Sequence, residues 1–205
     1  MSLGVSPRQT LTALEELVAL LEQLERARTS VMALARGGRE QEPWILYPGE
    51  YGIFDRRTQS QFYYHAHAGA DYEAGHFHTA FLFPDHAVHL VAISMAESGW
   101  PQALFTVNCW LVGDTYEPGE NLKRYAHRFY IAPRRGQAPL IRFVNLMFRA
   151  FIEEIERLQD EKDEGLQAYR AAHPGQDPLQ DRSFEILSWV EIDVRAALAR
   201  ASTPL

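Results

Sequence analysis

Two His-x-His pairs on either side of a short acidic loop are the residues best suited to chemistry in this sequence. His65 and His67 lie in the run Tyr-Tyr-His-Ala-His, and His76 and His78 lie in Gly-His-Phe-His. In an extended strand, residues two apart project from the same face. Histidine is the commonest metal ligand and titrates near neutral pH. The spacing therefore predicts a histidine cluster on one face of a β-hairpin.

The pairing of the two strands decides how the four rings meet. If His67 lies opposite His76, antiparallel pairing places His65 opposite His78, with paired Cβ atoms about 4.5–5.5 Å apart. Four imidazolium ions at such distances would repel one another, so the rings must stay neutral, share protons or hold a cation. We therefore expect these four histidines to bind a divalent transition metal. Zinc, iron, nickel, copper and manganese all accept imidazole nitrogen.

Other residues near the histidines are candidates to complete the site. Glu73 and Asp71 lie in the connecting loop and can supply a carboxylate, while Tyr63 and Gln61 share the histidine face of their strand. We expect Tyr63 and Gln61 to contact a small-molecule ligand. The next strand of a meander would bring His89 alongside the cluster.

A second group of candidates follows in the run Asn-Cys-Trp-Leu-Val-Gly-Asp. Asn108 and Trp110 would share one face of a strand expected over 104–112, and Asp114 comes just after it, where functional groups often lie. Asn108 and Trp110 are thus candidate ligand-binding residues. Glu73 or Asp114 is the candidate general base for a metal-activated water. The simpler alternative is that Trp110 is a core residue and Asp114 caps a turn.

The elements that must position these residues indicate one α+β domain over residues 1–205. Strands joined by short connections favour an antiparallel meander, either open or barrel-like. The charged run 159–164 is expected to be a solvated stretch or a helix end and not a binding tail. The expected parts are an N-terminal helix (6–37), a histidine-bearing sheet (44–132), a helical segment (139–172), and a late strand with a C-terminal helix (183–205).

The composition limits the classes of protein to which this chain can belong. The chain has 205 residues, 46% of them apolar, which suffices for a full core. A net charge of -7 with dispersed basic residues argues against nucleic acid as a partner. A single cysteine fits a reducing cytoplasm, and no apolar run approaches the roughly 18 residues that span a bilayer. We therefore expect a cytoplasmic protein without a membrane partner.

Three functions agree with these patterns. The first is a metal-binding protein or metal-dependent enzyme that acts on a small molecule. The second is a metal-free pocket in which Tyr63, His65 and His76 hydrogen-bond a polar ligand. The third is an interaction module with structural histidines, in which the apolar stripe of the N-terminal helix forms a homodimer contact instead of packing on its own core.

The motifs also resemble those of known families. Tyr-Tyr-His-Ala-His (63–67), Gly-His-Phe-His (75–78) and Asn-x-Trp (108–110) resemble the signature of an uncharacterised bacterial domain family of unknown function, over roughly residues 44–190. That resemblance implies no activity. His65, His67 and Glu73 resemble the first half of the cupin metal motif, but the spacing to Glu73 is longer and cupins lack the second His-x-His pair.

Overall fold

The computed structural model describes residues 5–69 and 72–203, so Asp71 lies outside the described residues. The helices are α1 (Pro7–Arg26), α2 (Val31–Arg36), α3 (Cys109–Val112), α4 (Gly119–Arg128), α5 (Ala138–Ala150), α6 (Ile152–Ala172), the short 3-10 helix η1 (Pro178–Gln180) and α7 (Val194–Ala201). The strands are β1 (Ile53–Asp55), β2 (Ser60–His65), β3 (Gly75–Leu82), β4 (Ala87–Met95), β5 (Pro101–Val107) and β6 (Ile186–Glu191).

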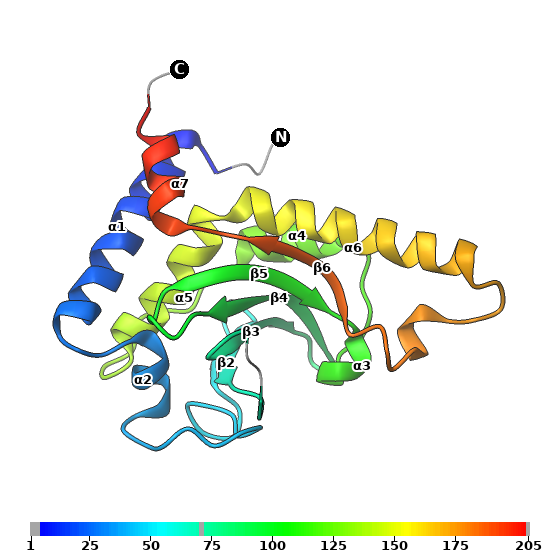
Figure 1. Cartoon of the computed structure of the whole chain (residues 1–205), viewed down its shortest axis with the longest axis horizontal. Coiled ribbons are helices and arrows are strands. Elements are labelled where there is room, and N and C mark those ends of the chain that lie inside the picture. The colour runs from blue at the N-terminus through cyan, green and yellow to red at the C-terminus, as the bar shows by residue number, and fades with distance from the viewer. Residues whose placement is uncertain (1–4, 70–71, 204–205) are drawn as a thin grey trace.

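The strands form one antiparallel sheet in the order β1-β2-β3-β4-β5-β6. The first five follow one another as a meander, and β6 returns beside β5 after the intervening helices (Figure 1). This confirms the α+β class and the antiparallel meander. The barrel-like alternative is wrong, because β1 pairs only with β2 and β6 only with β5 within the described residues.

The two faces of the sheet have different partners. Phe62, Tyr64 and Phe77 point into the main apolar core, which they share with leucines of α1 and with apolar residues of α5 and α6. The histidines alternate with these aromatic residues and so lie on the opposite face. In Figure 1, α1 and α7 stand together at one end of the sheet and α6 runs beside β6. In the described part of the chain, no helix is both long and apolar enough to cross a membrane.

The expected helix over 6–37 is two helices. A capping box begins the first helix, because Ser6 accepts a hydrogen bond from the Gln9 N–H and the Gln9 side chain accepts one from the Ser6 N–H. The chain then turns between α1 and α2, with Arg28 at φ 52. The apolar stripe of α1 is buried on the chain's own core. A homodimer through α1 remains a prediction, and it would have to use the exposed face of this helix.

Three further segments differ from expectation. The strand expected over 104–112 ends at Val107, and α3 follows it. The segment after Pro139 divides at Phe151 into α5 and α6. The charged run 159–164 lies inside α6, where Gln159 and Lys162 are buried and not solvated. A helix that lies on a sheet buries one side, so even a charged run contributes residues to the core.

Candidate metal centre

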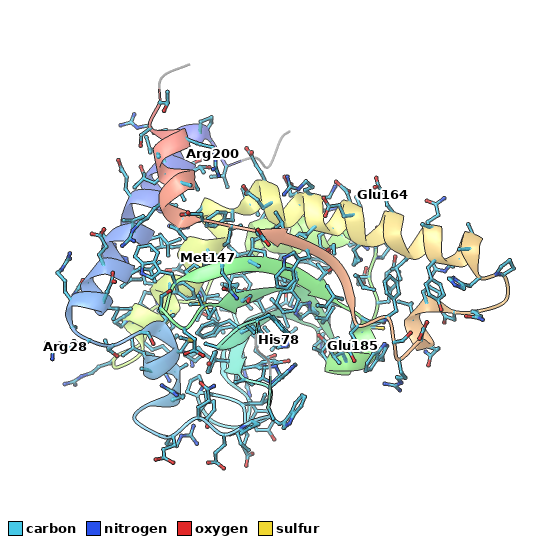
Figure 2. The ribbon with its side chains drawn as sticks, viewed as in Figure 1. Arg28, His78, Met147, Glu164, Glu185 and Arg200 are labelled. Carbon is cyan, nitrogen blue, oxygen red and sulfur yellow. The ribbon has the colours of Figure 1, made fainter. Side chains whose placement is uncertain are left out.

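Three imidazoles converge on one face of the sheet, where β2 ends and β3 begins. The Nε2 atoms of His65 and His76 are 2.7 Å apart, those of His76 and His78 are 2.9 Å apart, and those of His78 and His65 are 3.2 Å apart. We call these residues the histidine triad. Figure 2 shows His78 among the strands, well apart from Glu164 on α6. One ring nitrogen each of His65, His67 and His76 also lie within 4.8 Å of one another, so the cluster could hold a metal ion.

The register that brings these rings together differs from the expected one. His65 pairs with His76, and Tyr63 pairs with His78, so the hairpin is shifted by two residues and its loop is longer. The pairing expected between His67 and His76 is therefore wrong, as is that between His65 and His78. A shift by two keeps every side chain on its predicted face. His67 falls beyond the end of β2, yet its ring centroid is still 5.1 Å from that of His76.

A glycine allows this close pairing. Gly75 begins β3 with φ 141, and a Cβ at this position would lie 2.6 Å from the carbonyl oxygen of His65 and 2.5 Å from the Tyr64 hydroxyl. Both contacts are too short for a real side chain. A glycine is thus required where β3 begins, directly before His76.

Glu73 orients His76. Its Oε1 atom is 2.6 Å from Nδ1 of His76, and its Oε2 atom accepts a hydrogen bond from the Ser94 hydroxyl at 2.7 Å. Burial raises the pKa of Glu73, but the hydrogen bond and charge interaction with His76 and the hydrogen bond from Ser94 outweigh it and leave the pKa below its ordinary value. An ionised carboxylate can only accept, so Nδ1 of His76 carries a proton, and Nε2 is the nitrogen that faces the triad.

His89 lies at Nδ1 of His78, as Glu73 lies at Nδ1 of His76, and the predicted meander had placed His89 alongside the cluster. Nδ1 of His78 and Nε2 of His89 lie 2.9 Å apart. A β-bulge places His89 there: Thr79 pairs with Val91 but Ala80 pairs with His89, so Leu90 faces no residue of β3. The carbonyl of Leu90 accepts a hydrogen bond from the Gln159 side chain on α6.

Burial keeps the rings of His65, His78 and His89 neutral. It lowers the pKa of His65 and that of His89 to about 3, and it lowers the pKa of His78 well below its ordinary value. The neighbouring imidazoles act in the same direction, because adjacent positive charges would repel. Neutral imidazole is the form that binds metals.

Apolar and aromatic groups surround the cluster. Phe105 contacts the edge of His76, with ring centroids 5.3 Å apart, and Trp189 stacks on Phe105. Trp44 stacks on His67 at 4.3 Å between centroids and has a left-handed backbone, φ 69, held by a hydrogen bond from its N–H to the Ala66 carbonyl. Such a backbone costs about 1–3 kcal/mol for a residue other than glycine. This conformation places the Trp44 indole on the ring of His67.

Asp114 lies beside His89 and not at the triad. Both residues border a small pocket of ≈ 20 Å³, together with Cys109 and Lys162. Burial raises the pKa of Asp114 to about 6. Tyr63 contacts His78, with centroids 5.1 Å apart, and burial and the charge of Asp114 both raise the pKa of its hydroxyl.

The other candidates have structural partners. The Gln61 side chain donates a hydrogen bond to the Tyr51 carbonyl. Asn108 lies just before α3 and donates to the carbonyls of Pro178 and Phe184, and Trp110 lies within α3 and donates to the Asp181 carbonyl. Asn108 and Trp110 therefore do not share a strand face, and they attach the segment before β6 to the end of β5.

Sequence reasoning did not find two residues of this site. Ser94 lies on the histidine face of β4, opposite His76, and the alternation of that strand was the available signal. No sequence signal indicated Trp44, because a tryptophan in a loop gives no sign that it stacks on a histidine more than twenty residues later.

Comparison with known proteins identifies the family. No curated protein and no solved structure matches this chain. The family model described as "Domain of unknown function (DUF6969)" matches residues 11–192, which include every residue of the histidine cluster. The match also agrees with the family resemblance of the sequence motifs, since no activity is assigned to either. This chain belongs to that family of unknown function.

Proposed function

We propose that this protein binds one divalent transition metal ion through the Nε2 atoms of the histidine triad. The observation that carries the proposal is the triangle of nitrogens with sides of 2.7, 2.9 and 3.2 Å. An ion at the usual metal–nitrogen distance of about 2.1 Å from all three fits about 1.2 Å above their plane. Three imidazole ligands suit zinc, iron, nickel or manganese.

The hydrogen bonds around the triad suit a metal site. Glu73 fixes a proton of His76 on Nδ1. One proton lies between Nδ1 of His78 and Nε2 of His89, and we assign it to His78, because a metal-ligating histidine usually donates from its other nitrogen. The Nε2 atoms of His76 and His78 then both carry lone pairs, 2.9 Å apart, and repel each other. One proton on His65 cannot satisfy both nitrogens. A cation bound to both nitrogens removes the repulsion. In metal sites, a ligating histidine usually donates its other N–H to a carboxylate, as His76 does to Glu73.

We further propose that the metal keeps one exchangeable position and acts on a small molecule, as a Lewis acid or by activating water. His67 lies beside the triad, but it is outside β2 and stacked on Trp44. Both oxygens of Glu73 are already bonded, so its role here is to orient His76 and not to accept a proton from substrate.

Metal content of the protein without a polyhistidine tag tests the first proposal. We expect one ion per chain after purification or after dialysis against zinc, iron, nickel or manganese, and none in the double variant His65→Gln/His78→Gln. His127→Gln is the matched control, because His127 is hydrogen-bonded to Glu156 on the helical side. A wild-type protein that binds none of these ions in stoichiometric amount would overturn the proposal.

A second set of variants separates an open centre from a closed structural one. If the double variant does not fold by circular dichroism, His65→Gln alone replaces it, since His65 is partly exposed. His67→Ala should keep one metal per chain if the fourth position is open. Loss of the metal in His67→Ala would show that His67 is a ligand and that the site is closed.

A further inference from the structure

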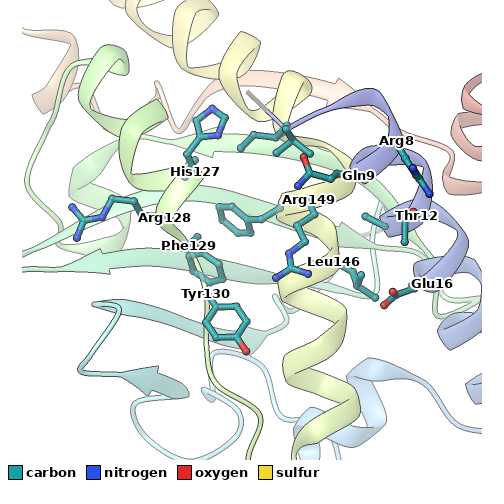
Figure 3. Close-up of a pocket in the computed structure, with 15 residues that line it drawn as sticks. Arg8, Gln9, Thr12, Glu16, His127, Arg128, Phe129, Tyr130, Leu146 and Arg149 are labelled. Atoms are coloured by element: carbon teal, nitrogen blue, oxygen red, sulfur yellow. The ribbon is translucent and has the colours of Figure 1, made fainter. Parts of the chain in front are cut away.

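A pocket of ≈ 580 Å³ lies on the helical side of the sheet, away from the histidine triad. It is bounded by the first turns of α1, by the end of α4 with the residues that follow, and by α5 (Figure 3). This volume lies in the range of small-molecule sites, about 300–1,000 Å³. The pocket shares no lining residue with the histidine triad.

The floor of the pocket is apolar and closely packed. Phe129 and Phe148 stack nearly parallel, with centroids 3.9 Å apart, and both are buried. Ala13, Leu146 and Ile152 are also buried in the lining. Such a floor accepts the apolar body of a ligand without first having to rearrange.

The margin of the pocket is positively charged, on a chain whose net charge is -7. Arg8, Arg128 and Arg149 are all exposed there, and within the described residues none of them forms an ion pair. In Figure 3, Arg8 and Arg128 stand at opposite margins and Arg149 lies between them. The one acidic side chain in the lining, Glu16, is already paired with Arg142 at 3.0 Å.

We propose that this pocket binds a small organic anion with one acidic head and an apolar body. The head, a carboxylate or a phosphate, pairs with Arg149 and Arg8, whose planar guanidinium groups donate hydrogen bonds in a geometry that matches both acids. The body lies on the Phe129–Phe148 pair. Positive charge above an apolar floor selects such an amphipathic anion over a neutral molecule of equal shape.

Calorimetric titration with octanoate tests this proposal, with octanamide as its neutral analogue and octyl phosphate as the second acid. We expect the wild type to bind octanoate or octyl phosphate, and to bind octanamide about tenfold more weakly or worse, because a charge-assisted hydrogen bond is lost. The stronger of the two acids identifies the preferred head group.

Substitution then locates the site. Arg8→Gln/Arg149→Gln should weaken binding of the preferred acid by about tenfold or more and leave octanamide binding unchanged. Arg170→Gln, an exposed arginine at the end of α6, is the control and should change neither. Chemical shift changes at Phe129 and Phe148 would confirm the location. The proposal is overturned if neither acid binds, or if the double variant binds the acids as well as the wild type.

Discussion

Oε1 of Glu73 lies 2.6 Å from Nδ1 of His76, while its other oxygen accepts from Ser94, so one buried carboxylate joins the hairpin loop, β3 and β4. This contact sets which nitrogen of His76 is free. It also makes the loop that carries Glu73 part of the proposed metal centre, in which Glu73 would orient a ligand and would not itself bind the ion.

Glu73→Gln should weaken metal binding while leaving the ligands in place. The amide oxygen can still accept from Nδ1 of His76, but the negative charge that makes the imidazole a stronger base is gone. Loss of such an outer partner typically costs 10- to 100-fold in affinity, so we expect a decrease of about that size. Competition with a chromophoric chelator measures it. Ser94→Ala, which leaves the carboxylate charge intact, should have a smaller effect, and equal effects would contradict this role for the charge.

Gly75→Ala should disrupt the pairing of His65 with His76. The added Cβ would lie 2.6 Å from the His65 carbonyl oxygen, in a backbone with φ 141. We expect a loss of about 3 kcal/mol in the free energy of unfolding, measured in urea, with weaker metal binding. Gly136→Ala is the control, because Gly136 also has a positive φ, 80, but open space around it. A similar loss in both variants would attribute the effect to φ and not to the contact.

Thr79→Val should loosen the bulge that places His89. The buried Thr79 hydroxyl donates to the Val91 carbonyl at 2.6 Å and accepts from the Val91 N–H at 3.2 Å. Valine keeps the volume but leaves both groups without this partner, at a cost of about 1–3 kcal/mol. Hydrogen exchange of the Val91 amide should accelerate in Thr79→Val and not in Thr79→Ser, which keeps the hydroxyl. Equal exchange in the two variants would contradict the prediction.

Asp55 should make stability depend on pH in the acid range. Hydrogen bonds from the backbone N–H groups of Ala132 and Arg57 outweigh burial and hold its pKa below the ordinary value of 3.8. A lowered pKa in the folded state stabilises the protein above pH 3.8, and this contribution is lost as the pH falls through the folded pKa. Asp55→Asn should therefore be less stable than the wild type by about 1–3 kcal/mol at pH 7. Urea unfolding should show this difference shrink below pH 4, and a constant difference would exclude the ionised carboxylate as its cause.

The sequence correctly predicted on which face of the sheet the histidines lie, but not which residue each of them pairs with on the neighbouring strand. Alternation of apolar and polar residues placed His65, His76 and His78 on one side of the sheet, and the structure agrees. The pairing was off by two residues because alternation has a period of two, so registers that differ by two satisfy it equally well. The close approach of Gly75 to the His65 carbonyl is a local contact that distinguishes them.

Segments whose structure depends on distant partners could not be predicted. The run after Val107 is as apolar as a strand, yet Asn108 donates to carbonyls some seventy residues later and the chain turns into α3. Gln159 is polar by type, but the carbonyl of Leu90 on another element provides its buried partner. Such contacts form only in the assembled fold, so no local sequence pattern predicts them.

The single extra residue in β4 decides how many histidines the site contains. With strict alternation, Leu90 would share the face of Ala92 and Ser94, and His89 would point toward the helices. The bulge reverses the faces of the residues that precede Val91 in β4. Leu90 therefore lies in the core, and His89 lies next to His78. The bulge therefore determines whether β4 contributes a histidine to this face: in a regular strand of the same sequence, His65, His76 and His78 would remain, but His89 would not reach His78.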